Sequence, residues 1–227
     1  MIPAFPVYLF DVDGTLVDSA DDICGALQTV LSTTPRSDVE HAFLKRYIGY
    51  HLLELFGDLF PDKTPQDIDQ LILEYRSVYP ARGHKLTKLY PGVLETIPVL
   101  PGRKSTATTK GTPTTRMILE QFGLLPFFAH VQGTDGFPCK PEPDVILRSL
   151  EVFRADPSDC LMIGDSAPDM EAGRRAGVKI CGVRYGYGDL AKMQAFEPDY
   201  WIDDIRQLIP AEVPHHAAED IPDQVKA

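Results

Sequence analysis

Two aspartates, Asp11 and Asp13, stand one residue apart directly after the apolar run 7–10. One carboxylate of such a pair can attack phosphorus, while the other transfers protons to the leaving group and from water. Gly14 follows them and permits a tight turn in which backbone amides approach an anion. An ordinary acidic turn that caps a helix explains the same residues. The pair alone therefore leaves a catalytic and a structural interpretation open.

A second acidic pair, Asp165 and Asp169, follows the apolar run 161–163. A helix is expected to begin near Pro168, so both carboxylates can face a hard cation such as Mg²⁺, which prefers oxygen ligands. Aspartate at a helix start is also favourable without a metal, because it interacts with free backbone amides. Metal binding and helix capping both remain open for this pair.

Three further side chains suit a phosphate group. Lys140 is followed by Pro141 and lies in a loop that prolines stiffen, and its ammonium can neutralise both a phosphate and a carboxylate nucleophile. Thr108 and Thr109 end a predicted strand and offer hydroxyls and amides to phosphate oxygens. A solvated surface lysine and a threonine-rich turn are the alternative interpretations.

The candidate residues follow segments that the sequence predicts to be strands. Short, largely apolar runs predict strands at 7–10, 105–108, 129–132, 160–164 and 178–183. Helical spacing and proline or acidic starts predict helices at 91–100, 113–122, 143–153 and 169–176. This alternation predicts an α/β fold, a Rossmann-like and mostly parallel sheet with helices on both faces and a ligand site beyond the carboxyl ends of the strands.

The stretch 16–86 interrupts the alternation. It predicts helices near 21–31, 39–47, 52–60 and 66–79 and no convincing strand. We interpret it as an inserted helical cap domain over the site; a subdomain with a packing role is the alternative. The core domain is then 1–15 and 87–210. The tail 211–227 is predicted to be flexible, and we assign no metal site to its adjacent histidines, His215 and His216.

Composition limits the classes of partner. The chain has 227 residues, 44% of them hydrophobic, which suffices for one large domain or one domain with an insertion. A net charge of −11 repels nucleic acid and anionic membranes, so neither is an expected partner. The four cysteines form no C-x-x-C pair and no stretch reads as a membrane span or leader. We therefore expect a cytoplasmic protein that is a monomer or a homodimer.

Four segments, taken in order, resemble the motifs of the haloacid dehalogenase superfamily. They are DVDGTLVDS at 11–19, Thr108, KPEP at 140–143 and GDSAPD at 164–169. The helical insertion between the first two motifs, and YPGV at 90–93 where the core resumes, resemble the phosphoglycolate phosphatase-like branch with its small α-helical cap. The resemblance covers nearly the whole chain and implies a Mg²⁺-dependent phosphatase.

The resemblance also implies a role for each matched residue. Asp11 is the nucleophile, which forms a phosphoaspartate, and also a metal ligand. Asp13 is the general acid and base and lends its backbone carbonyl to the metal. Because dehalogenases of the family lack this second acid, Asp13 argues against dehalogenation. Among the other matches, Thr108 and Lys140 bind the phosphoryl group, Asp165 ligates Mg²⁺, and Asp169 supports the metal or its waters. Thr109 stands where many relatives of this branch have asparagine.

The substrate implied is a small phosphorylated metabolite, with phosphoglycolate or a sugar phosphate as the best candidates. Substrate choice in a capped enzyme should come from cap residues that meet the core site, and candidates are Tyr47, Gly49, His51 and Arg76. Arg76 can clamp a carboxylate, or lie on a solvated helix face. A phosphomutase of the beta-phosphoglucomutase kind and a catalytically silent binding protein are the alternative functions.

Overall fold

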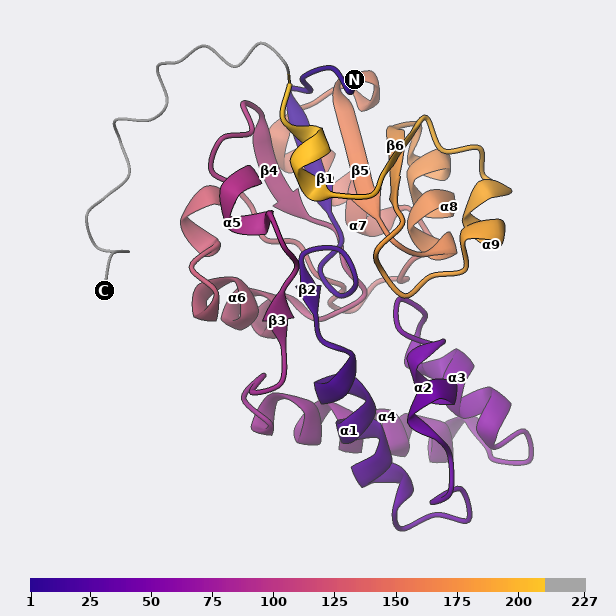
Figure 1. Ribbon diagram of the computed structural model, residues 1–227. Helices are drawn as coiled ribbons and strands as arrows, with labels where there is room; N and C mark the ends of the chain where they lie inside the picture. Colours follow the sequence, from indigo (N-terminus) through magenta and orange to yellow (C-terminus); the bar gives the residue numbers. More distant parts are fainter. Residues whose placement is uncertain (211–227) are drawn as a thin grey trace.

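The core of the protein is a five-stranded, entirely parallel sheet (Figure 1). The computed structural model describes residues 1–210, so the predictions for the tail, including His215 and His216, lie outside the described residues. The strands, in their spatial order, are β4 (Arg103–Thr106), β1 (Val7–Phe10), β5 (Cys160–Gly164), β6 (Lys179–Val183) and β7 (Tyr200–Ile202). Because β1 lies between β4 and β5, the residues that follow it lie between those that follow these two neighbouring strands at the carboxyl edge.

Hydrophobic clusters on both faces hold helices to this sheet. Because side chains alternate along a strand, Tyr8 and Phe10 join the cluster on one face and Val7 and Leu9 join the cluster on the other. The first face is covered by α5 (Val93–Thr96), α6 (Thr112–Gln121) and the short 3₁₀ helices η1 (Leu125–Phe127) and η3 (Ile205–Leu208). The second is covered by α7 (Asp144–Phe153), α8 (Ala167–Ala176) and α9 (Leu190–Gln194), and the 3₁₀ helix η2 (Pro157–Asp159) precedes β5. The predicted α/β fold is confirmed.

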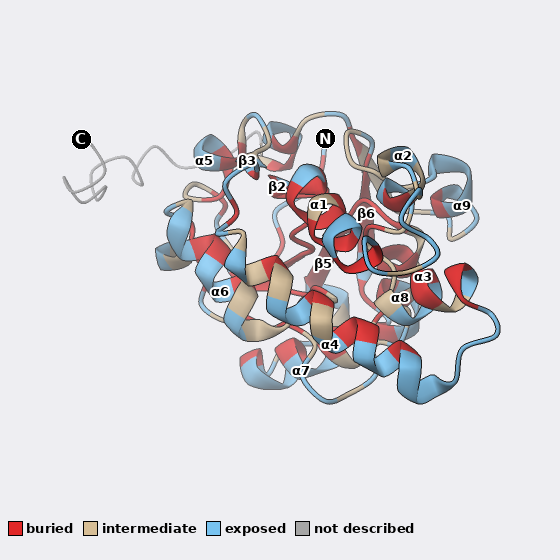
Figure 2. Cartoon of the chain, turned by 90° about the horizontal axis from the view of Figure 1, so that it is seen from below, coloured by how far each residue is buried: buried red, intermediate tan, exposed pale blue. Residues whose placement is uncertain are grey.

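Four helices form the lower part of the molecule in Figure 1, and we keep the name cap for residues 16–86. They are α1 (Ala20–Leu31), α2 (His41–Lys45), α3 (Leu52–Leu59) and α4 (Pro65–Ala81). They surround a hydrophobic cluster of their own, with Leu27, Phe56 and Ile72 among its members. The helices α1 and α4 bury one side and expose the other (Figure 2), as amphipathic helices around a core do.

A two-stranded antiparallel ribbon, β2 (Val17–Asp18) paired with β3 (Lys88–Leu89), joins the four cap helices to the sheet, so the expectation that 16–86 holds no strand is wrong at its start. The buried carboxylate of Asp22 in α1 holds the segment that leads from α4 to β3. Its Oδ2 accepts hydrogen bonds from the backbone N–H groups of Leu86 and Thr87, each at 2.8 Å. The two segments that enter and leave the cap are thus tied together. This arrangement determines where the cap helices lie relative to the sheet.

The predicted strand at 129–132 is wrong. Only an isolated bridge between Ser105 and His130 forms there. Two residues further along, the backbone N–H of Gln132 donates to the side-chain hydroxyl of Thr106 (2.8 Å), and that hydroxyl donates back to the Gln132 carbonyl (2.9 Å). The Thr106 side chain therefore occupies the N–H and carbonyl groups of Gln132 that pairing with a neighbouring strand would need.

Among the described residues, no helix is both long and apolar enough to cross a membrane.

Candidate active site

Three buried carboxylates, those of Asp11, Asp165 and Asp169, meet at the carboxyl edge of the sheet. Phe10 of β1 pairs with Ile163 of β5, so the residues that follow these parallel strands emerge side by side. One oxygen of each carboxylate lies within 4.8 Å of the others. The structure therefore brings together one residue of the first acidic pair and both residues of the second, and we call them the carboxylate cluster.

The backbone around Asp165 leaves almost no free space. Its Oδ1 accepts a hydrogen bond from the Thr15 hydroxyl (3.3 Å), and its Oδ2 accepts one from the Tyr187 N–H (2.8 Å). Gly14 has φ +85°, a conformation that favours glycine, and a Cβ at Gly14 or at Gly186 would collide with the Asp165 side chain. The loops after β1 and β6 are thus built closely around this one carboxylate.

Asp169 caps a helix and belongs to the carboxylate cluster at the same time. Its Oδ2 accepts hydrogen bonds from the backbone N–H (2.9 Å) and the hydroxyl (2.6 Å) of Ser166, which completes a capping box at the start of α8. Its Oδ1 pairs with Lys140. The capping interpretation of the second acidic pair is therefore correct for Asp169, and it does not exclude a contribution to a metal site.

Lys140 is fully buried, which overturns the alternative of a solvated surface lysine. Its Nζ donates a hydrogen bond to Asp11 Oδ1 at 2.9 Å and a second one to Asp169. Burial by itself lowers the pKa of Lys140, but the carboxylates of Asp11 and Asp169 outweigh it and raise that pKa above its usual range. A fixed ammonium therefore lies against the Asp11 carboxylate.

The carboxylate cluster carries more negative charge than Lys140 can compensate. Burial raises the pKa of Asp11 to about 7, with Lys140 opposing the shift and Asp169 adding to it. Burial, followed by repulsion from Asp169 and Asp11, raises the pKa of Asp165 well above its usual range. A divalent cation would relieve both effects, and carboxylate oxygens are the donors that Mg²⁺ prefers. Asp11, Asp165 and Asp169 therefore fit a Mg²⁺ ion.

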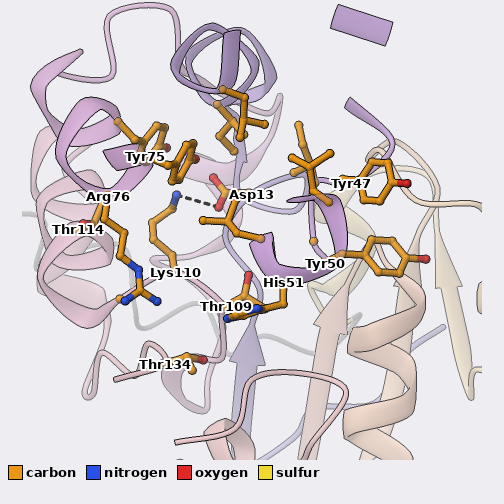
Figure 3. A pocket seen from close by; sticks show the side chains of 18 of the residues that line it. Asp13, Tyr47, Tyr50, His51, Tyr75, Arg76, Thr109, Lys110, Thr114 and Thr134 are labelled. Carbon is orange, nitrogen blue, oxygen red and sulfur yellow. Dashed lines mark ion pairs between the residues drawn. The ribbon is translucent and has the colours of Figure 1, made fainter. Parts of the chain in front are cut away.

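Asp13 is not part of the carboxylate cluster, and its side chain points toward Lys110 in the cavity (Figure 3). Its Oδ2 lies 3.1 Å from the Nζ of Lys110, and its Oδ1 accepts a hydrogen bond of 2.6 Å from the hydroxyl of Ser19. The Lys110 ammonium also lies 4.1 Å from the ring centre of Tyr79 in α4. The two acids of the first motif thus face different surroundings, a closed cluster for Asp11 and an open cavity for Asp13.

Thr108 and Thr109 follow β4 at the same edge of the sheet. The backbone N–H of Ala107 bonds to the carbonyl of Phe10 (2.7 Å), so the parallel pairing continues past β4, where Ala107 lies opposite Asp11 and Thr108 follows it. Thr108 is buried, whereas Thr109 lines the cavity below the cap. Both positions suit contacts with a phosphate group, Thr108 in the buried edge of the sheet and Thr109 at the cavity wall.

A cavity of about 330 Å³ separates the cap from the carboxyl edge of the sheet (Figure 3). Its walls include all four cap residues that the sequence suggested, Tyr47, Gly49, His51 and Arg76. The Arg76 side chain extends from α4 toward His51, and no carboxylate within residues 1–210 pairs with it. Burial, and then the charge of Arg76, lower the pKa of His51. The cavity therefore combines an uncompensated cation from the cap with Asp13 from the core.

Sequence reasoning missed three residues of this site, Ser19, Lys110 and Tyr187. Ser19 ends the first motif, and Lys110 follows the threonine pair, yet neither position indicated a partner. The alternation of tyrosine and glycine at 185–188 was the available signal for the Tyr187 loop. All three bond to residues of the two acidic pairs.

The family model for haloacid dehalogenase-like hydrolases matches residues 8–183, a range that contains all four predicted motifs. The chain belongs to this family. The phosphoglycolate phosphatase of Vibrio vulnificus (strain YJ016) is 32% identical over 211 residues, which cover 88% of this chain and 92% of that protein. The phosphoglycolate phosphatase of Agrobacterium fabrum is also 32% identical, over 217 residues that cover 92% of this chain and 93% of that protein.

Solved structures of this hydrolase family have the same fold. A haloacid dehalogenase-like family hydrolase from Streptococcus pneumoniae superposes with a TM-score of 0.80 at 25% identity, covering 90% of this chain and 96% of that one. A predicted phosphatase from Clostridium acetobutylicum superposes with a TM-score of 0.82 at 26% identity, covering 91% and 97%. The predicted family is confirmed, and the protein is an enzyme of the hydrolase class.

Proposed function

We propose that this hydrolase is a Mg²⁺-dependent phosphatase that cleaves a small phosphate monoester through a phosphoaspartate on Asp11. The observation that carries the proposal is the pairing of the buried Asp11 with the Lys140 ammonium, with two further carboxylates beside it. The relatives named phosphoglycolate phosphatase support the same chemistry. Mg²⁺ held by Asp11, Asp165 and Asp169 would neutralise phosphoryl charge, which a chain of net charge −11 otherwise repels.

In the first step a carboxylate oxygen of Asp11 bonds to phosphorus while the ester bond between phosphorus and the leaving oxygen breaks. Asp13 donates its proton to that oxygen, which leaves as an alcohol. Lys140 and Thr108 hold phosphoryl oxygens, because an ammonium and a hydroxyl at the nucleophile supply the hydrogen bonds that this anion needs. The cavity next to Asp13 receives the departing part of the substrate.

In the second step Asp13, now ionised, accepts a proton from a water molecule. The water oxygen bonds to phosphorus as the bond to Asp11 breaks, which releases inorganic phosphate and restores the Asp11 carboxylate and the protonated Asp13. Ser19 and Lys110 contact the two Asp13 oxygens and so orient this carboxyl group. The same acid thus serves the leaving group first and the water second.

Phosphoglycolate is the substrate we favour. The relatives that match most of this chain carry that name, and Arg76 lines the cavity with no carboxylate partner within residues 1–210. A guanidinium can bind a substrate carboxylate through two parallel hydrogen bonds. A sugar phosphate would instead depend on the tyrosines and threonines of the same cavity.

The test is phosphate release from a panel of small monoesters, with Mg²⁺ and then with a chelator, for the wild type and for Asp11→Asn. We expect metal-dependent release that falls on the order of 10⁴-fold or more in the variant, as loss of a nucleophile does. The matched control is Asp21→Asn, an exposed carboxylate of α1, which should stay within about twofold. Release without metal, or an active Asp11→Asn, would contradict the proposal.

A further inference from the structure

The loop between β6 and α9 reaches the cap through the side chain of Tyr187. Its hydroxyl lies at the start of α1, where it accepts hydrogen bonds from the backbone N–H groups of Ser19 (2.7 Å) and Ala20 (3.2 Å). The same hydroxyl donates to Asp18 Oδ1 at 2.6 Å. The first amides of a helix have no partner within the helix. Tyr187, more than 160 residues away in sequence, supplies one for two of them.

Ser19 occupies the N-cap position of α1, yet its side chain makes no capping bond. A serine at this position usually accepts a hydrogen bond from an amide two or three residues further on. Here the Ser19 hydroxyl instead donates to Asp13 Oδ1 at 2.6 Å. The serine that could stabilise its own helix is therefore directed at the candidate acid and base, while a tyrosine from the core holds the helix start.

The backbone of Tyr187 contacts the other half of the site. Its N–H donates to Asp165 Oδ2 at 2.8 Å, and the Lys45 ammonium of α2 lies 5.0 Å from the centre of its ring. Tyr187 thus contacts both the carboxylate cluster and the start of α1, and through Ser19 it is connected to the Asp13 carboxylate. A change confined to the Tyr187 hydroxyl leaves the contact with Asp165 intact, because that contact is made by the backbone.

We propose that Tyr187 is a positioning residue, whose hydroxyl holds the first turn of α1 so that Ser19 orients the Asp13 carboxylate at the floor of the cavity. The inference rests on the proposed function for the role of Asp13 in proton transfer. Because neither Tyr187 nor Ser19 lines the cavity, loss of the hydroxyl should slow turnover and leave substrate binding unchanged.

The first variant is Tyr187→Phe, which keeps the ring and the N–H that contacts Asp165. We expect kcat to fall about 10-fold to 100-fold, the usual effect of removing a partner that orients a site residue. KM and the Mg²⁺ concentration for half-maximal activity should stay within about twofold. An unchanged kcat, or a loss confined to KM, would overturn the inference.

A double-mutant cycle tests the path through Ser19. If Tyr187 acts on Asp13 through Ser19, then Ser19→Ala should lower kcat, and adding Tyr187→Phe should lower it little further. The control is Tyr185→Phe in the same loop, whose hydroxyl donates to the Thr15 carbonyl at 3.0 Å. Its effect should add to that of Ser19→Ala. Additive effects of Tyr187→Phe and Ser19→Ala would overturn the inference.

Amide hydrogen exchange measured without metal or substrate gives a readout that needs no activity. Tyr187→Phe should accelerate exchange at Ser19 and Ala20, and Tyr185→Phe should not. Unchanged exchange in Tyr187→Phe would overturn the inference.

Failure of this inference and failure of the proposed function can be told apart. A wild-type protein that releases no phosphate would overturn the proposed function, and the exchange experiment would still decide whether Tyr187 holds α1. An active wild type with an additive cycle would overturn only the role of Tyr187.

Discussion

The carboxylate cluster and the cavity below the cap are adjacent parts of one site, and they are built in opposite ways. The three carboxylates of the cluster and the Lys140 beside them each have an exposed fraction of 2% or less. Hydrogen bonds to one another or to the backbone hold them in place. In the cavity, the cap residue Arg76 is exposed and His51 is half-buried, and Arg76 has no ion-pair partner among the described residues.

This difference matches the two tasks that a capped phosphatase must combine. Charge that develops on a phosphoryl group is best stabilised by groups that are already fixed and desolvated, because they need not reorganise during the reaction. The remainder of the substrate varies between enzymes of one fold, so its binding groups belong on a separate element. We therefore expect substitutions in the cluster to affect both stability and turnover, and substitutions of the cap residues in the cavity to affect substrate choice alone.

The largest effect should follow from Lys140→Met, which removes the ammonium and keeps a side chain of similar length. Asp11 and Asp169 then lose a buried partner, and breaking such a pair costs about 3 to 5 kcal/mol. We expect that loss in the free energy of unfolding, measured by urea denaturation in chelator, together with loss of phosphate release.

The matched control is Lys104→Met, because Lys104 is also buried but donates to the carbonyls of Leu100 (2.7 Å) and Gly102 (3.0 Å). Its loss leaves no carboxylate unpaired and should cost about 1 to 3 kcal/mol. Turnover by folded Lys104→Met should match the wild type. A Lys140→Met protein as stable and active as this control would show that the cluster does not depend on its lysine.

An intermediate effect should follow from Arg76→Met. Loss of one charge-assisted hydrogen-bonding partner costs about 1.5 to 3 kcal/mol, so kcat/KM for phosphoglycolate should fall about 10-fold to 150-fold, mostly through KM. Stability should not change. The controls are ethyl phosphate, which has no carboxylate and should be hydrolysed equally by both proteins, and Arg46→Met, a cap arginine outside this cavity. Equal losses for both substrates would remove Arg76 from substrate recognition.

The last prediction concerns the pH dependence of stability without metal. Asp11 has a pKa near 4 in an unfolded chain and about 7 in the folded protein, so the folded state binds more protons between these values. Stability in chelator should therefore be highest at the acidic end and fall as pH rises from about 4 to 7. Saturating Mg²⁺ should suppress this fall, and Asp11→Asn should weaken it. Thermal unfolding at pH 5 and pH 8 checks this; equal trends with and without metal would contradict it.

The fold was largely predictable because its signals are local. A buried parallel strand reads as a short apolar run, and Val7–Phe10, Cys160–Gly164 and Lys179–Val183 all form where such runs stand. The segment 129–132 is only half apolar, and it fails as a strand because the Thr106 hydroxyl bonds to the backbone N–H and carbonyl of Gln132. Competition of that kind depends on a residue far away in sequence.

The sequence by itself determined which acids lie at the carboxyl edge of the sheet. Asp11, Asp165 and Asp169 follow short apolar runs, and such runs predict where a buried strand ends. Tertiary structure decided what each side chain does there. It buried Lys140 between two carboxylates, turned Asp13 toward Lys110 and Ser19, and brought Tyr187 to the start of α1. These contacts join loops up to 168 residues apart, and hydrogen bonds between such loops form only once the packed sheet and cap have set their distance.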